Sequence, residues 1–93
     1  MITAIVLIKA DMGSIPEVGE AIARLDGVSE VYSITGEYDL VAMVRVHRHD
    51  DLAEVIPGRL NKTPGVISTE THIAFRTYSK HDLEAAFSVG MGD

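Results

Sequence analysis

The chain has 93 residues and no cysteine, and 8 Lys and Arg against 14 Asp and Glu give a formal net charge of −6. This length fits one domain with a modest core, and the acidic balance would repel a phosphate backbone, so direct nucleic-acid binding is not expected. No apolar run approaches the ~20 residues of a membrane span, and the N-terminus lacks the features of a secretory signal. We therefore expect a cytoplasmic protein without membrane segments or disulfides.

The first predicted element is a strand in residues 1–10, MITAIVLIKA. Both alternations of this segment are apolar, with Ile5 and Leu7 on one side and Val6 and Ile8 on the other. This pattern is typical of a strand that is covered on both faces.

The next segment, GSIPEV, indicates the start of a helix. Ser14 stands at the N-cap position, Pro16 lies in the first turn, and Glu17 completes a capping box. An apolar stripe at helical spacing follows, and Gly27 ends the helix.

A second strand is predicted in VSEVYSIT, residues 28–35. The pair Gly36-Glu37 has the composition of a tight type II′ hairpin turn into a third strand, YDLVAMVRV. A turn at this position places Tyr32 opposite Val41 and Glu30 opposite Met43.

A second helix is expected from Asp50 or Asp51, kinked or shortened by Pro57. The fourth strand is predicted in VISTETHIAF, residues 66–75. We assign residues 1–78 to one domain and residues 79–93 to a C-terminal extension, in which KHDLEAAF forms a short helix and the last five residues fray.

The order β-α-β-β-α-β consists of two similar halves, each closing its helix with Gly-Val before a strand. Right-handed crossovers place the strands in spatial order 4-1-3-2 with both helices on one face. The prediction is an α+β, ferredoxin-like fold with an antiparallel four-stranded sheet.

Two helices cover only one face of this sheet, yet both faces of its central strands are apolar. Leaving four large apolar side chains in water forfeits several kcal/mol, at about 1.5–3 kcal/mol each, which is comparable with the stability of a small domain. We expect a second copy to cover the open face, giving a sheet-to-sheet homodimer, a dimeric α/β barrel. The alternatives are an exposed face or closure by the C-terminal segment. The partner-facing set is Glu30, Tyr32, Ile34, Asp39, Val41, Met43 and Arg45.

The segment TGEYDLVAMV, residues 35–44, offers groups that suit a zwitterion. The carboxylates of Glu37 and Asp39 could bind an ammonium group. Backbone N–H groups around Gly36 could bind a carboxylate, with the hydroxyls of Ser33, Thr35, Thr69 and Thr71. The alternative is an ordinary hairpin turn with no ligand.

The same segment, followed after a helix by TPGVISTETHI, resembles the ligand-sensing RAM domain of the Lrp/AsnC (feast/famine) transcriptional regulators. The resemblance runs from Ile2 to Tyr78, and its specific part is G-x-Y-D joined to the later P-G-V-x-x-T/S-x-T. It implies an effector site formed by Gly36, Glu37, Tyr38, Asp39, Thr69 and Thr71. Strand alternation, however, places Thr69 and Thr71 on the expected helix side.

The resemblance also implies dimers that assemble into rings, commonly octamers, with amino-acid effectors bound between dimers. Regulators of this family carry an N-terminal helix-turn-helix, whereas this sequence opens directly on a strand. We therefore expect a stand-alone, non-enzymatic sensing and oligomerisation module. It would modulate transcription through mixed assembly with a full-length Lrp/AsnC regulator, or buffer the ligand.

The competing hypothesis is a small dimeric α/β-barrel enzyme, a cofactor-independent monooxygenase or isomerase, in which Tyr32 and His72 meet across a cleft. The absence of Trp and the late position of the only Asn, Asn61, weigh against it. No third ligand accompanies any pair of the four histidines. We expect no catalytic residue, no metal and no other cofactor.

Overall fold

Strands and helices follow one another in the order β-α-β-β-α-β in the computed structural model of this chain, which describes residues 1–80. The elements are β1 (Ile2–Ala10), the 3-10 turn η1 (Met12–Ser14), α1 (Ile15–Ala23), β2 (Val28–Ser33), β3 (Leu40–Val46), α2 (His49–Val55), the π-helical η2 (Ile56–Leu60) and β4 (Val66–Ile73). The expected terminal helix falls on residue 80 and on residues outside the described part. None of the helices in residues 1–80 has the length and apolarity needed to cross a bilayer.

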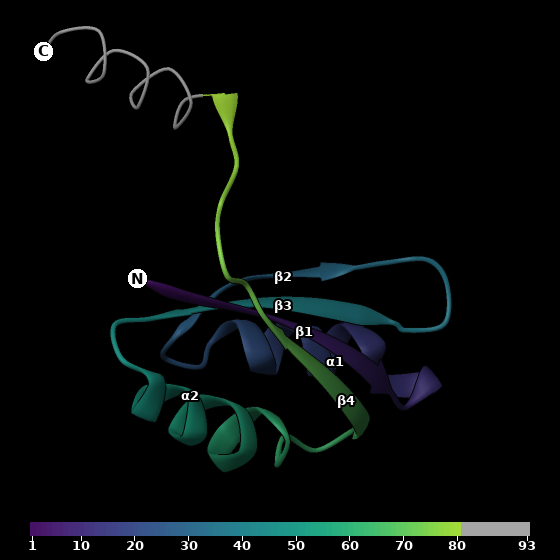
Figure 1. The fold of residues 1–93 in the computed structure, drawn as a ribbon. Coiled ribbons are helices and arrows are strands. Elements are labelled where there is room, and N and C mark those ends of the chain that lie inside the picture. Colours follow the sequence, from purple (N-terminus) through teal and green to yellow (C-terminus); the bar gives the residue numbers. More distant parts are fainter. Residues whose placement is uncertain (81–93) are drawn as a thin grey trace, which may run out of the picture.

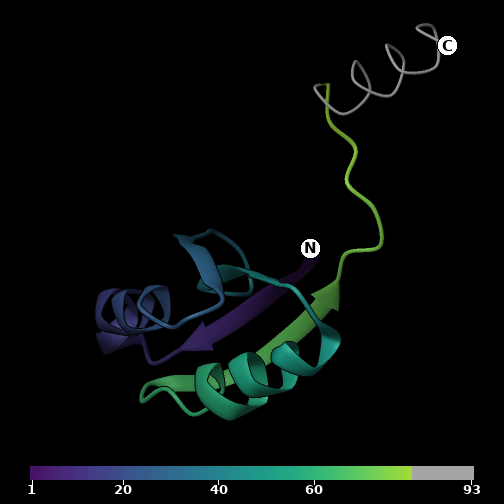
Figure 2. The same ribbon diagram turned by 90° about the vertical axis from the view of Figure 1, so that its left-hand side faces the viewer.

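The four strands form one antiparallel sheet in the order β2-β3-β1-β4, which confirms the predicted topology. Tyr32 pairs with Val41 and Glu30 pairs with Met43, as the hairpin register predicted. Both helices lie on the same face of the sheet (Figures 1 and 2). The fold is therefore the expected ferredoxin-like sandwich of one sheet and one helix layer.

The core lies between the sheet and the helices. One alternation of each central strand points into it and is buried, and apolar residues of the helices complete it: Ala4, Val6, Ile8, Ala10, Leu40, Ala42, Val44, Val46, Val18, Ile22, Leu52, Val55, Ile56 and Leu60. The other alternation has no helix of residues 1–80 over it and is only half-buried: Ile5, Leu7, Val41 and Met43. We call these four side chains the open-face stripe.

The two halves of the chain pack against each other through a matching pair of glycines. Gly27 and Gly65 each precede the valine that opens a strand, and their φ angles are +94° and +95°. A Cβ on Gly27 would come within 2.7 Å of Val55 Cγ2 in α2, and a Cβ on Gly65 within 2.5 Å of Val18 Cγ2 in α1. Each half therefore requires a glycine both for its backbone conformation and for the helix of the other half.

The first helix begins where it was predicted, but the predicted capping box is not formed. Ser14 occupies the N-cap position of α1, yet its side chain makes no capping hydrogen bond. Its hydroxyl instead donates to Asp11 Oδ2 at 3.3 Å, because the 3-10 turn η1 brings these two residues together.

The α-helical part of the second helix ends at Val55, two residues before Pro57, which confirms the predicted shortening. Proline has no N–H to donate to the carbonyl of Ala53, and from Ile56 the chain widens into the π-helical η2, where the Asn61 N–H donates to the Ile56 carbonyl at 2.8 Å. The wider turn keeps Ile56 and Leu60 in the core. The proline is thus accommodated by a change of helix type.

Candidate functional site

The loop between β2 and β3 is longer than the predicted two-residue turn. β2 ends at Ser33 and β3 begins at Leu40, and the loop is closed by the Ile34 N–H, which donates to the Asp39 carbonyl at 3.0 Å. Gly36 lies at its tip with φ +109°, and no atom lies within 4 Å of the place that a Cβ would occupy there. The tip therefore leaves room for a ligand against the backbone.

Asp39 fastens this loop to the end of β1. Its N–H donates to the Ile8 carbonyl at 2.9 Å, and its Oδ2 accepts the Ala10 N–H at 3.0 Å. At this point the pairing of β1 with β4 changes register, between Lys9 and Ala10. The Asp39 carboxylate thus satisfies a main-chain donor where the ladder is irregular, which explains part of the G-x-Y-D sequence without any ligand.

Tyr38 lies outside β3, and its side chain reaches across β1 to β4. Its hydroxyl donates to Glu70 Oε1 at 3.1 Å, and Glu70 Oε2 lies 2.7 Å from His72 Nε2. The contact with His72, and then the bond from Tyr38, lower the pKa of Glu70 below that of an ordinary carboxyl. The bond to Glu70 in turn raises the pKa of Tyr38.

Glu70 is the residue at this end of the sheet that the sequence reasoning missed. It pairs with Leu7, and His72 pairs with Ile5, so both side chains lie on the open face. The alternation of β4 would have shown that Glu70, rather than its threonine neighbours, shares a face with the open-face stripe.

Thr69 and Thr71 lie on the other face. They pair with Ile8 and Val6, whose side chains enter the core, and the Thr69 hydroxyl donates to Asn61 Oδ1 at 2.9 Å. The structure therefore brings Gly36, Glu37, Tyr38 and Asp39 together on one loop but leaves the two threonines on the helix side. A ligand that touches both groups would need residues from more than one copy.

Glu37 is the loop carboxylate that has no hydrogen-bond or ion-pair partner among residues 1–80. It is exposed. Lys9, whose place in β1 gives it the alternation of the open-face stripe, likewise has no ion pair in this part of the chain. One free carboxylate and one free ammonium thus lie at the same end of the sheet.

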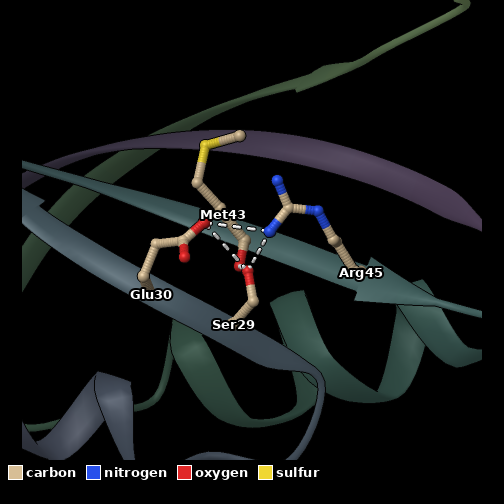
Figure 3. A network of polar contacts seen from close by, with 4 residues as sticks. All are labelled: Ser29, Glu30, Met43 and Arg45. Carbon is tan, nitrogen blue, oxygen red and sulfur yellow. Dashed lines mark hydrogen bonds and ion pairs between the residues drawn. The ribbon is translucent and has the colours of Figure 1, made fainter. Parts of the chain in front are cut away.

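A second polar cluster, at the other end of the open face, pairs its own charges. Arg45 Nη1 donates to Glu30 Oε1 at 2.9 Å and also to Ser29 Oγ (Figure 3). The register shift between Val28 and Glu30 places the Ser29 hydroxyl where it also donates to the Met43 carbonyl at 3.1 Å. The bond from Arg45 lowers the pKa of Glu30. The charges of this cluster are thus paired within one copy, whereas the Glu37 carboxylate of the loop has no ion pair within residues 1–80.

The residues of the enzyme hypothesis do not meet within one copy. Tyr32 lies on β2 and His72 on β4, which are the two outer strands, with β3 and β1 between them. Both side chains are exposed. A catalytic pair of these residues has no support in the arrangement of a single chain.

Comparison with known proteins agrees with this arrangement. A family model described as the Lrp/AsnC ligand binding domain matches residues 3–83. The HTH-type transcriptional regulator PH1916 of Pyrococcus horikoshii, itself uncharacterised, is 37% identical over 78 residues, which are 81% of this chain and 52% of that protein. The chain spans between 39% and 52% of the length of the first curated relatives that it matches.

Solved structures give the same result. TTHA0845 from Thermus thermophilus superposes with a TM-score of 0.81 at 48% identity, covering 86% of this chain and all of that one. A feast or famine regulatory protein from M. tuberculosis, solved in complex with L-methionine, superposes with a TM-score of 0.70 at 28% identity, covering 86% of this chain and 54% of that one. The sequence match and the shared fold establish that this chain belongs to the Lrp/AsnC ligand-binding domain family.

Proposed function

We propose that this chain is an amino-acid-sensing and oligomerisation module that modulates transcription through assembly with full-length Lrp/AsnC regulators. The observation that carries the proposal is the loop of residues 34–39, with open space at Gly36 and the free carboxylate of Glu37, at the end of an uncovered apolar sheet face. The family is one of transcriptional regulators, which supports a regulatory, non-enzymatic role.

Two copies would pair through their open faces. The open-face stripe is apolar, central in the sheet and half-buried in one copy, so covering it gains free energy of several kcal/mol at about 25 cal/mol per Å² of apolar surface. Pairing would also bring the loops and the β4 strands of two copies near one another. Further contacts between dimers would then build a ring, which we propose to be an octamer.

The effector would be a small zwitterion bound at the loop. The carboxylate of Glu37 would accept hydrogen bonds from its ammonium group, and the backbone N–H groups at Gly36 would donate to its carboxylate. Tyr38 and Asp39 would hold the loop in place through Glu70 and Ala10, and the negative charge of Asp39 would add to the attraction for the ammonium group. Thr69 and Thr71 would come from another copy. The complex of the M. tuberculosis relative with L-methionine supports an amino acid as the effector class.

DNA contact would come from a helix-turn-helix on a full-length partner. Both helices of residues 1–80 pack on the sheet, and the chain carries a formal charge of −6, which disfavours contact with phosphates. The first curated relatives are named HTH-type regulators and are about twice as long as the segment matched here. Such an assembly would act in the cytoplasm.

A thermal-shift screen of the twenty amino acids, with L-methionine first, tests the proposal. A ligand at 100 times its dissociation constant adds about 2.7 kcal/mol of stability and raises the melting temperature by several degrees. Light scattering with and without the ligand reports the assembly. No shift with any amino acid in the wild-type chain, or the same shift in Glu37→Gln, would contradict sensing at this loop.

A further inference from the structure

A hollow lies at the end of the sheet opposite the loop of residues 34–39. It has a volume of about 350 Å³ and is formed by the connection from α1 to β2, the end of β3, and α2 with η2. Figure 1 shows that β3 passes into α2 at this end, whereas the β2–β3 loop lies at the other. Pockets that bind small molecules commonly have volumes of about 300–1,000 Å³, so this one has room for a molecule of the size of an amino acid. We call it the β3–α2 hollow.

The inner part of the β3–α2 hollow is apolar, and its rim is charged. Val46 and Val55 line it as core residues, with exposed fractions of 7% and 5%. The charged lining consists of Asp26 after α1, Asp51 and Glu54 on α2, Arg59 in η2 and Arg45 at the end of β3. Such a lining suits a ligand that has charged ends and an apolar middle.

Most of these charges have no partner. The side chains of Asp26, Asp51, Glu54 and Arg59 make no hydrogen bond or ion pair within residues 1–80. Arg45, in contrast, is paired with Glu30. The Arg59 guanidinium thus stays apart from the carboxylates with which it shares the hollow. Each of these groups is free to bind a charge on a ligand.

The excess of carboxylates selects a ligand with more than one positive charge. Three carboxylates share the hollow with one unpaired guanidinium group. They are not gathered around one point, since no group of three or more His, Asp and Glu side chains in residues 1–80 is arranged to hold a metal ion. The favoured cation is therefore an organic one whose positive groups lie apart. The Arg59 guanidinium would bind a carboxylate on the same molecule.

We propose that the β3–α2 hollow is a second binding site, for a basic amino acid that carries two ammonium groups, such as L-lysine. The carboxylate of this ligand would accept hydrogen bonds from Arg59. One ammonium group would donate to Asp26, the other would donate to Asp51 and Glu54 on α2, and the methylene chain between them would lie on the apolar inner part. The site lies within one copy, so it depends neither on the pairing of open faces nor on the loop site of the proposed function.

Calorimetric titration of the full chain with L-lysine tests the site. Binding should remain in Glu37→Gln and should weaken about tenfold or more in Arg59→Gln and in Asp51→Asn, because each of the last two removes a charge-assisted hydrogen bond. Lys62 is an exposed cation after η2 that does not line the hollow, so Lys62→Gln should bind L-lysine as the wild type does. The absence of binding in the wild type, or its loss in Glu37→Gln, would overturn the proposal.

Two analogues of lysine assign the groups. Cadaverine keeps both ammonium groups but lacks the carboxylate, so Asp51→Asn should weaken its binding and Arg59→Gln should not. Norleucine lacks the second ammonium group and should bind at least about ten times more weakly than L-lysine. Norleucine that binds as tightly as L-lysine, or an equal loss of affinity for cadaverine and L-lysine in Arg59→Gln, contradicts the assignment.

The same variants separate this site from the loop site. A response to L-lysine at the hollow is independent of Glu37, so sensing at the loop is judged with amino acids that have no second ammonium group. Failure of the loop site appears as a thermal shift with such an amino acid that Glu37→Gln does not change. Failure of the hollow appears as a response to L-lysine that Arg59→Gln does not change.

Discussion

The two faces of the sheet are built from the same kinds of residue but have different surroundings. On one face Val6, Ile8 and Val44 are fully buried under α1 and α2. On the other face Leu7, the neighbour of Ile8 in β1, is only half-buried and no described helix lies over it. The covered face stabilises one copy, and the open face offers its apolar side chains to a partner outside that copy. Apolar residues at alternate positions of a strand therefore indicate that a sheet face is to be buried. They do not show whether helices of the same chain or a second copy will cover it.

The largest expected effect is on the covered face. Ile8→Ala leaves a cavity among fully buried side chains, and we expect it to lower the free energy of unfolding by about 2–5 kcal/mol. Urea denaturation at low protein concentration measures this change. Leu7→Ala is the matched control, since its effect should depend on protein concentration whereas that of Ile8→Ala should not. A loss in Leu7→Ala as large as in Ile8→Ala, and independent of concentration, would show that the two faces do not differ.

The next effect sharpens the contrast from the open side. Met43→Lys places a charge in the open-face stripe, where one copy leaves the side chain in contact with water but a sheet-to-sheet dimer would bury it. We expect the dimer dissociation constant to rise by about a hundredfold or more, with little change in the folding of one copy. Sedimentation or light scattering over a dilution series measures the constant, and Glu54→Lys on α2 is the exposed control. A dimer that tolerates Met43→Lys must pair through some other surface.

The fold was predictable from residues whose local and long-range roles agree. The Gly-Val repeats at Gly27 and Gly65 mark strand starts, and their positive φ angles and tight helix contacts explain why glycine stands there. The hairpin register followed from the position of Gly36, which is why the open face was identified correctly. These features depend on the geometry of the backbone, which short sequence patterns report well.

The loop between β2 and β3 and the N-cap of α1 were less predictable, because their side chains bind other partners than the local motif indicated. The Asp39 side chain binds the backbone of β1, and β3 begins two residues later than the turn composition indicated. Ser14 binds Asp11 instead of the helix backbone. The role of Glu70 depends on which side of β4 faces the open sheet. In each case the partner of the side chain lies outside the short motif that was used for the prediction. The motif alone therefore does not show which contact forms.

A smaller effect separates the structural role of Asp39 from a role in binding. Asp39→Ala removes the acceptor of the Ala10 N–H, and we expect a loss of about 0.5–1.5 kcal/mol in unfolding free energy. Asp39→Asn keeps an acceptor oxygen, so most of this stability should remain. Both variants should keep the dimer and lose the thermal shift with an amino acid, since each removes the charge. An unchanged shift in Asp39→Asn would assign the residue to the loop alone.

The smallest effect concerns pH and the cluster of Tyr38, Glu70 and His72. The pKa of Glu70 is lower in the folded chain than in an unfolded one, so its contacts stabilise the fold above the ordinary carboxyl pKa, and this stability is lost as pH falls through the folded value. The melting temperature of Glu70→Gln should therefore lie below that of the wild type near neutral pH and converge with it in acid. Glu54→Gln removes an exposed carboxylate that makes no ion pair within residues 1–80, and should show no such convergence. A difference in melting temperature between Glu70→Gln and the wild type that stays the same at every pH would contradict this. It would mean that the Glu70 side chain acts through packing, because contacts of an ionised carboxylate weaken when it is protonated.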